Sequence, residues 1–154
     1  MIQRIQTIYL ALVAALSGIL LYGNIVNLVG ENGESYSLSY RGISLMHDGA
    51  AEIVEKSLPL TILLFALPLL FLISIFLFKN RKLQIRLTVF STLLQAGALI
   101  MILYYVFFTV NKLGASLLFN VKITFPLIGV ILGYLAFRAI LKDELLIKSY
   151  DRIR

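Results

Sequence analysis

Long apolar stretches alternate with short polar and charged segments along the chain, and this pattern predicts its main elements. A bilayer core of about 30 Å needs roughly 20 apolar residues at a rise of about 1.5 Å each. Four stretches reach this length, at about residues 7–29, 57–78, 87–110 and 123–141. Because the middle of each stretch lacks Asp, Glu, Lys, Arg and His, we interpret all four as transmembrane helices.

The order and spacing of these stretches predict the fold class. Short connections between most successive spans favour antiparallel neighbours. We therefore expect an all-α membrane protein, an up-down-up-down bundle of four transmembrane helices in a single integral membrane domain over residues 1–154. The first span is interpreted as retained, because its apolar run is longer than that of a usual signal peptide and no clear A-x-A cleavage site follows it.

The first loop, about residues 30–56, is expected to form a small β flap over the outer end of the bundle. The dipeptide N-G in "GENGES" is a strong turn signal, and "SYSLSY" alternates serine with larger side chains, as a half-buried strand does. A partner strand is expected at residues 25–29 or 42–46. Beyond these, "GAAEIVEK" predicts a short helix with Asp48 as its N-cap.

This loop also contains the cluster that most resembles a metal site, namely His47, Asp48, Glu52 and Glu55. The chain has one histidine, and its spacing to the carboxylates matches no H-x-x-E or H-E-x-x-H motif. We therefore interpret these residues as a cap, a helix face and a solvated imidazole. No metal and no cofactor are predicted, and a docking surface for a periplasmic partner is favoured over a metal site in this loop.

Composition supports a membrane location and argues against a nucleic-acid partner. Apolar residues make up 60% of the chain and charged residues 14%, whereas soluble domains have about 25% charged residues. The net charge of +6 comes from short basic runs between apolar stretches, the pattern of topology signals and of contact with anionic headgroups. The chain has no cysteine, which excludes disulfides and thiolate sites.

The distribution of cations predicts the orientation. One side of the predicted bundle has ten Lys and Arg residues, including those of the loop "KNRKLQIR" and of the tail, and the other side has four. By the positive-inside rule, both termini lie in the cytoplasm. The fourth helix is expected to continue beyond the membrane as a cytoplasmic extension over residues 142–154, because its apolar residues recur at helical spacing.

Small and polar residues within the spans are candidates for helix packing. Gly129 and Gly133 form a G-x-x-x-G motif, and Ala14 and Gly18 have the same spacing. Such residues let helices approach closely in lipid, within one chain or between two copies, and packing within the bundle is the preferred interpretation. Ser91 and Gln95 are the candidates for intramembrane polar packing, with Gln95 expected to form an interhelical hydrogen bond or a line of polar contacts with Ser91.

No catalytic residues are predicted. A nucleophile with a base, or a metal set, is needed for hydrolysis or transfer chemistry. The spans contain no cysteine and no carboxylate, and the histidine lies outside them. Coupled transport usually needs ionisable groups at depth, and none is found there.

The two ends of the chain carry a resemblance. "MIQRIQTIYL" and "KDELLIKSYDRIR" resemble the ends of an uncharacterised family, a domain of unknown function found in small four-span inner-membrane proteins of Bacteroidota. The resemblance implies a bacterial inner (cytoplasmic) membrane protein and supplies no activity. Arg4 is expected to pair with Asp143 or Glu144. The candidate interaction residues at both ends are Arg4, Lys142, Asp143, Glu144, Asp151 and Arg152.

Together these features predict a non-enzymatic accessory or scaffold subunit of a membrane complex. Its partners would be membrane lipid, with anionic headgroups at the cytoplasmic face, and a protein bound through the tail or the outer loop; a homo-oligomer stays open. One alternative is a small oligomeric transporter or channel lined by Ser91, Thr92 and Gln95. Another is a lipid-binding protein that uses the aromatic residues between 104 and 108.

Overall fold

The computed structural model describes residues 5–30, 34–47, 50–118 and 120–151. Its helices are α1 (Ile5–Ile19), α2 (Leu58–Phe76), α3 (Arg81–Leu113) and α4 (Phe125–Asp151), with short 3₁₀ turns η1 (Leu77–Lys79) and η2 (Val121–Thr124). Its strands are β1 (Asn24–Val29), β2 (Ser35–Ser39), β3 (Gly42–His47), β4 (Ala50–Lys56) and β5 (Ser116–Leu118).

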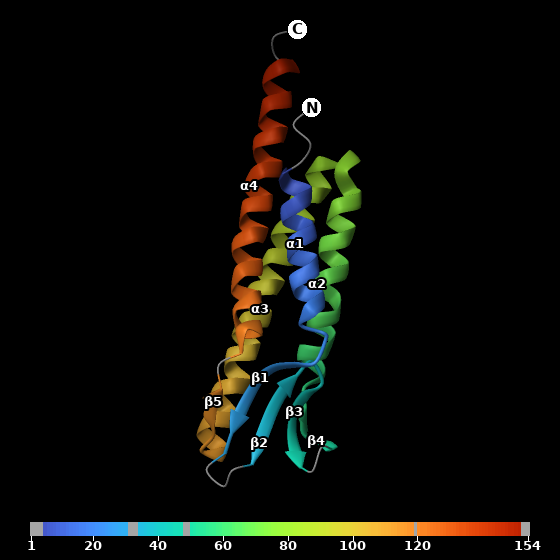
Figure 1. Cartoon of the computed structure of the whole chain (residues 1–154). Coiled ribbons are helices and arrows are strands. Elements are labelled where there is room, and N and C mark those ends of the chain that lie inside the picture. Colours follow the sequence, from blue (N-terminus) through green and yellow to red (C-terminus); the bar gives the residue numbers. More distant parts are fainter. Residues whose placement is uncertain (1–4, 31–33, 48–49, 119, 152–154) are drawn as a thin grey trace.

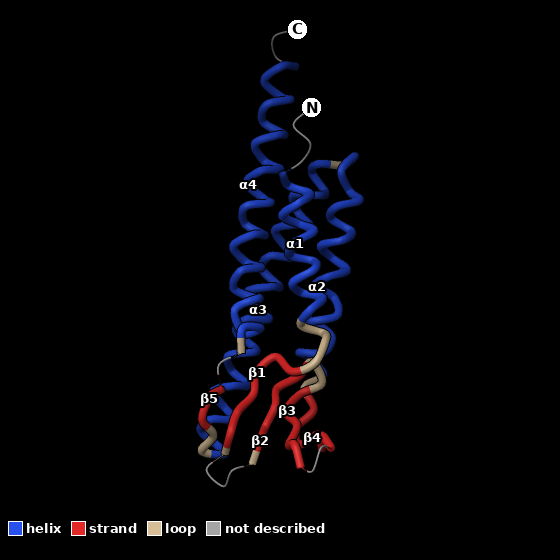
Figure 2. Tube along the Cα trace, viewed as in Figure 1, coloured by secondary structure: helices blue, strands red, loops and turns tan. Residues whose placement is uncertain are grey.

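The four helices pack side by side, and the sheet lies beyond the ends of α1, α2 and α4, alongside the last turns of α3 (Figures 1 and 2). Helices α1 and α3 each pack against both α2 and α4. The core is continuous between helices and sheet, since buried residues of both, such as Leu10, Leu64, Ile102, Leu28 and Leu38, belong to one cluster.

The five strands form one antiparallel sheet in the order β4-β3-β2-β1-β5. The segment between α1 and α2 supplies four strands, and the segment between α3 and α4 supplies the fifth. Val26, Leu38 and Ile43 are paired across β1, β2 and β3 and are buried. Because side chains alternate between the faces of a strand, this row marks the face of the sheet that joins the common core.

The prediction of an all-α four-helix bundle is wrong. The described residues combine four helices with a five-stranded sheet, which makes a mixed fold. The first predicted span extends too far, because α1 ends at Ile19 and residues 24–29 form a strand. Gly23 has a φ of 71°, a conformation that glycine adopts without strain, and it separates the two elements. The run of β-branched residues that follows favours a strand once neighbours are available on both sides.

The short helix predicted after Asp48 is also wrong, because residues 50–56 form β4 and pair with β3. Asp48 itself lies outside the described residues. The sequence offers residues 25–29 or 42–46 as the partner of β2, and both segments pair with it. The physical reason for β4 is the same as for β1. Ile53 and Val54 are β-branched, and backbone hydrogen bonds to β3 outweigh the weak helical preference of residues 50–56.

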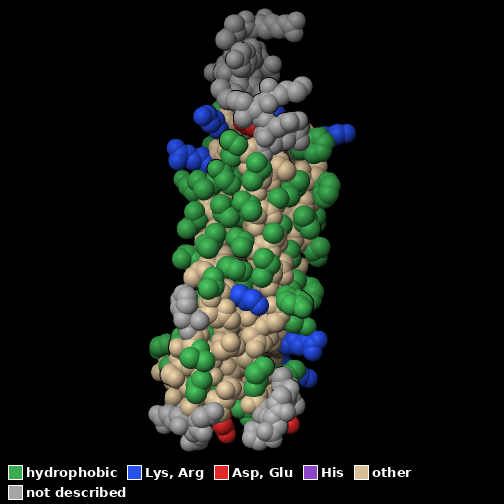
Figure 3. Space-filling model, viewed as in Figure 1, with side chains coloured by type: hydrophobic (Ala, Val, Ile, Leu, Met, Phe, Trp, Pro, Cys, Tyr) green, Lys and Arg blue, Asp and Glu red, His purple; other side chains and the backbone are tan. Residues whose placement is uncertain are grey.

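Three helical segments of the described chain are long and apolar enough to cross a membrane, namely Leu58–Lys79, Arg81–Lys112 and Val121–Leu145. Helix α1 is apolar but has 15 residues. Figure 3 shows hydrophobic side chains covering the helical part, with Lys and Arg gathered at its two ends. With 33 residues, α3 measures about 50 Å and exceeds a bilayer core of about 30 Å. Its last turns therefore lie beside the sheet.

Candidate functional site

A line of polar side chains occupies the buried face of α3. Gln84, Thr88, Ser91 and Gln95 recur at intervals of three and four residues, and none is more than 2% exposed. The same face continues toward the sheet with buried apolar residues, Ala98, Ile102 and Val106. The buried face of α3 is therefore mainly polar in the half near Arg81 and mainly apolar in the half nearer the sheet.

The hydrogen bonds of this line connect three helices. Ser17 Oγ of α1 donates to Gln95 Oε1 at 3.1 Å, and Gln84 Nε2 donates to the carbonyl oxygen of Ser74 in α2 at 3.0 Å. Ser91 Oγ donates to the carbonyl oxygen of Leu87 in its own helix. Ser17 was not among the residues selected from the sequence, although a serine within an apolar span is the signal that points to it.

Two side-chain atoms of this line, Thr88 Oγ1 and Gln95 Nε2, are buried without a hydrogen-bond partner, and so is Gln6 Oε1 of α1. A buried polar atom without a partner costs about 1–3 kcal/mol, and ordered water commonly satisfies such groups. All three groups are neutral amides or hydroxyls. They can hold water, and they provide neither a strong base nor a metal ligand set.

The glycines of the G-x-x-x-G motif face α3 within the same chain. A Cβ at Gly129 would lie 2.7 Å from Gln95 Nε2, and one at Gly133 would lie 2.5 Å from Thr92 Oγ1. Ala14 is buried on α1, while a Cβ at Gly18 would meet no atom within 4 Å. The absence of side chains at Gly129 and Gly133 therefore gives Gln95 and Thr92 their space.

The end of the molecule opposite the sheet contains those predicted interaction residues that the structure describes. Arg81 Nη1 donates to the backbone carbonyl oxygen of Asp143 at 3.2 Å, which attaches α4 to the turn between α2 and α3. Lys142 and Glu144 adjoin this contact in sequence. Arg4 and Arg152 lie outside the described residues, and Asp151 is the last residue of α4, so the pairing of Arg4 with Asp143 or Glu144 stays a prediction.

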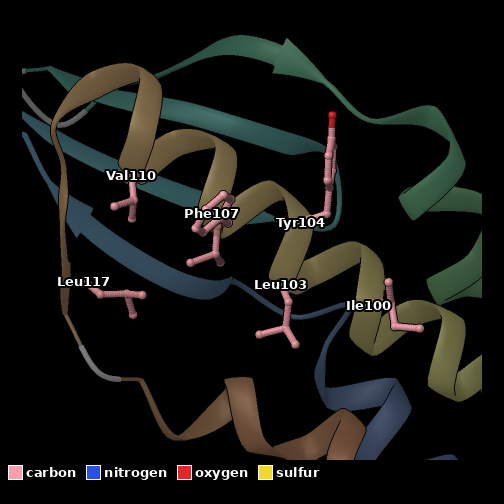
Figure 4. A pocket seen from close by; sticks show the side chains of 7 residues that line it. Ile100, Leu103, Tyr104, Phe107, Val110 and Leu117 are labelled. Atoms are coloured by element: carbon pink, nitrogen blue, oxygen red, sulfur yellow. The ribbon is translucent and has the colours of Figure 1, made fainter.

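An apolar groove of about 580 Å³ lies between the end of α3 and β5 (Figure 4). Its lining residues are Ile100, Leu103, Tyr104, Val106, Phe107 and Val110 of α3 and Leu117 of β5. Phe107 is 69% exposed. Aromatic residues of this segment were selected from the sequence for lipid contact, whereas Leu117 was missed because only the fold brings β5 to α3.

A row of side chains along α3 begins at this groove and leads away from it. The rings of Tyr104 and Phe108 are stacked with centroids 6.3 Å apart, and Lys112 Nζ lies 5.0 Å from the centroid of the Phe108 ring. Tyr104 lines the groove, whereas Lys112 lies about 180° from Leu103 around the helix and faces away from it. The groove itself is therefore an apolar surface.

The sheet contributes hydrogen-bonded polar pairs and no metal centre within its described part. Tyr36 Oη donates to Glu34 Oε2 at 2.7 Å. This hydrogen bond, followed by desolvation and the charge of Glu34, raises the pKa of Tyr36 above its usual value. Ser37 and Ser44 are bonded through their hydroxyls at 3.0 Å. The described residues contain no group of three His, Cys, Asp or Glu able to hold a metal ion.

Comparison with known proteins gives one match. A domain of unknown function, DUF4293, matches residues 2–153. The chain belongs to the DUF4293 family. Searches of curated proteins and of solved structures found no match. The match agrees with the resemblance to an uncharacterised family at the two ends of the chain, and it extends over nearly the whole of this DUF4293 protein.

Proposed function

We propose that this DUF4293 protein is a non-enzymatic accessory or scaffold subunit of a membrane complex, and that the C-terminal end of α4 binds its protein partner. The observation that supports this proposal is the length of α4. The helix continues to Asp151, so residues 145–151 extend about 10 Å beyond the segment that contacts Arg81 through Asp143. Figure 1 shows this end of α4 standing clear of the other helices, a geometry suited to recognition of a helix by a groove.

The location we propose is the inner membrane of a bacterium, in the four-span Bacteroidota family that the chain ends resemble, with both termini in the cytoplasm. The basic residues near the turn between α2 and α3 support this orientation under the positive-inside rule. Both termini on one side require an even number of crossings, so α1 would cross as well. Its packing between α2 and α4 supports this. The shared core of helices and sheet supports a single domain.

The chemistry of the interior supports a role without catalysis. The buried line on α3 consists of amides and hydroxyls; it contains no base or metal that would activate a hydroxyl as the nucleophile of a transfer reaction. The chain has no cysteine, and its one histidine ends β3 in the sheet. Binding, rather than turnover, is the activity that these surfaces support.

Removal of the projecting end tests this proposal. A chain ending at Leu145 keeps the bond between Arg81 and Asp143, and a matched control replaces residues 146–154 with a Gly/Ser segment of equal length, which is flexible. Purification in mild detergent from native membranes, followed by mass spectrometry, is expected to yield a stoichiometric protein partner with the full chain and to lose it with both variants. A partner retained by both variants, or no partner with the full chain, contradicts the proposal.

The polar line favours a second candidate, a small oligomeric transporter or channel for neutral solutes. Unpartnered atoms of Thr88 and Gln95 provide sites for water, while Ile102 and Val106 close the half nearer the sheet. Flux of water or glycerol into proteoliposomes distinguishes this candidate. A rate that falls in Gln95→Leu and is unchanged by the tail variants would support the channel over the scaffold.

A further inference from the structure

The turn between β2 and β3 lies beside the start of α2 and carries a positive charge there. Arg41 is exposed in this turn. Its backbone carbonyl oxygen accepts a hydrogen bond at 3.1 Å from the N–H of Ser57, the N-cap residue of α2. One turn further along α2, Thr61 Oγ1 donates to the carbonyl oxygen of Tyr40 at 2.7 Å. These bonds fix the turn against the first part of α2.

The guanidinium group of Arg41 is oriented by the neighbouring tyrosine. Arg41 Nε donates to Tyr40 Oη at 2.7 Å, and Arg41 Cζ lies 5.3 Å from the centroid of the Tyr40 ring. The other N–H donors of the guanidinium stay available, and a planar pair of them matches two oxygens of a phosphate group. Among the residues that the structure describes, no carboxylate forms an ion pair with Arg41. The side chain is therefore held in place without being neutralised.

The place of Arg41 beside a helix start favours an anion. The N-terminal end of a helix carries a partial positive charge, which attracts anions, and the side chain of Ser57 makes no capping hydrogen bond there. Lys122 shows the opposite arrangement, since its Nζ donates to the carbonyl oxygen of Tyr22 at 2.7 Å, just beyond the C-terminal end of α1. A cation is stabilised at that end of a helix. The charge of Arg41 instead adds to that of the helix end, and a bound anion would balance both.

An apolar surface leads from this charge along α2. The rings of Tyr40 and Phe65 meet edge to face, with centroids 5.8 Å apart. One face of α2 has exposed apolar side chains at helical spacing, namely Leu58, Ile62, Phe65 and Leu69. Phe65 lies about 12 Å along the helix axis from the N-cap residue. The charge and the apolar surface therefore follow each other in the order of the phosphate group and the acyl chain of a lipid.

A glycerophospholipid matches both parts of this surface. We propose that Arg41 binds the phosphate group of such a lipid in the leaflet nearer the sheet, while one acyl chain lies along the exposed face of α2. Figure 3 shows Lys and Arg side chains where the helices meet the sheet, the level of the headgroups if α2 crosses the membrane, and tyrosine is typical of this level. A free phosphate ion would leave the apolar face unused. This assignment rests on the membrane location proposed above and is independent of the scaffold role.

Binding of added lipid to the full chain in detergent micelles tests the site. Native mass spectrometry resolves each bound lipid by its mass, and the probe is palmitoyl-oleoyl phosphatidylglycerol. Arg41→Gln removes the charge at an exposed position, and the dissociation constant of the first lipid is expected to rise about tenfold, the equivalent of about 1.4 kcal/mol. Lys56→Gln is the matched control, because Lys56 is also exposed and pairs with Gly42, next to Arg41. It should leave the dissociation constant nearly unchanged.

Two further variants separate the orientation of the guanidinium from its charge. Tyr40→Phe keeps the ring beside Phe65 and removes the hydroxyl that holds Arg41 Nε, so the lipid should bind more weakly although no charge has changed. Arg41→Lys keeps the charge without the planar pair of donors and should bind more weakly than the natural chain. Unchanged affinity in Arg41→Gln would overturn the proposal. So would an equal loss in Arg41→Gln and Lys56→Gln, which would show a general attraction of anionic lipid to surface charge.

Two competitors test the two parts of the ligand. Inorganic phosphate and a diacylglycerol with the same acyl chains are each added to the chain with bound phosphatidylglycerol, and neither is expected to displace it at an equal concentration. Displacement by inorganic phosphate would assign Arg41 to a free anion, and displacement by the diacylglycerol would show that the phosphate group is not recognised; either result overturns the proposal. The chain ending at Leu145 should bind the lipid as the full chain does, so this proposal and the scaffold function fail independently.

Discussion

A single methyl group at Gly133 tests the close contact between α3 and α4. A Cβ at this position would lie 2.5 Å from Thr92 Oγ1 and 3.1 Å from Thr92 Cγ2. Thr92 is β-branched and therefore stiff at χ1, and its hydroxyl donates to the carbonyl oxygen of Thr88 at 2.7 Å. The side chain cannot turn away from the new methyl group without losing that hydrogen bond, so either the bond or the helix spacing must change in Gly133→Ala.

The magnitudes determine the sign of the effect. Overpacking of this kind costs about 1–3 kcal/mol, while alanine in place of glycine favours a helix by about 1 kcal/mol. The net effect is a loss of up to about 2 kcal/mol, so we expect Gly133→Ala to lower the free energy of unfolding. Gly97 lies on α3, and a Cβ there would meet nothing within 4 Å. Gly97→Ala should accordingly show only the helical gain, and its stability should equal or exceed that of the natural chain.

Equilibrium unfolding in mixed micelles titrated with a denaturing detergent measures these differences. The set comprises Gly133→Ala, Gly97→Ala, Thr92→Ala and the double variant Gly133→Ala/Thr92→Ala. Removal of the threonine side chain makes room for the methyl group, so the double-mutant cycle is expected to show a favourable coupling of about 1–2 kcal/mol. If Gly133→Ala proves as stable as Gly97→Ala, or if the cycle shows no coupling, the contact of α4 with Thr92 does not limit the spacing of the helices.

Two further predictions concern the sheet. Gly42 has a φ of 130°, and a Cβ there would meet the carbonyl oxygen of Glu55, so Gly42→Ala is expected to weaken the pairing of β3 with β4 by about 1–3 kcal/mol. Amide hydrogen exchange in β4 should be faster in the variant than in the natural chain, with little change in β1, and unchanged exchange in β4 would refute the prediction. The bond from Tyr36 to Glu34 raises the pKa of the phenol, which means that it stabilises the folded state below about pH 10 and that this contribution is lost as the pH rises through the raised pKa. Glu34→Gln should lower the pKa of Tyr36 in an ultraviolet titration, with Glu55→Gln as a control that leaves it unchanged.

Helices α2, α3 and α4 could be predicted because their apolar runs exceed the length of any ordinary strand. The predicted segment 57–78 corresponds to α2 with the η1 turn, and α3 and α4 include the segments 87–110 and 123–141. The serine and tyrosine alternation of β2 was equally clear, since a period of two has no helical interpretation. These elements depend on local pattern, which needs no knowledge of neighbours.

The first predicted span failed for the opposite reason. Residues 24–29 are as apolar as the helix before them, and hydropathy cannot separate an apolar strand from an apolar helix. Their conformation depends on β2 and β5, which lie on either side of β1, and β5 comes from a segment about 90 residues later. The same dependence explains β4, whose sequence suits a helix until β3 is placed beside it.

The residues of the candidate site could likewise be predicted from the sequence, whereas their contacts could not. Gln95, Gly129 and Gly133 could be selected from the sequence because polar and small residues are rare in apolar spans. Their contacts could not be predicted, since the bond from Ser17 to Gln95 joins residues 78 positions apart. Similarly, aromatic residues of α3 were visible in the sequence, whereas the groove exists only where Leu117 approaches them.

The sequence by itself determined that this DUF4293 chain has segments suited to lipid, where those segments lie and which side has more cations, because these properties are sums over neighbouring residues. Only the tertiary structure decided that part of the first apolar stretch joins a five-stranded sheet, which side chains fill the space over Gly129 and Gly133, and that Leu117 approaches α3 to form a groove. The physical reason is that strand pairing and close packing depend on residues distant in the chain, and their energies exist only when those residues meet.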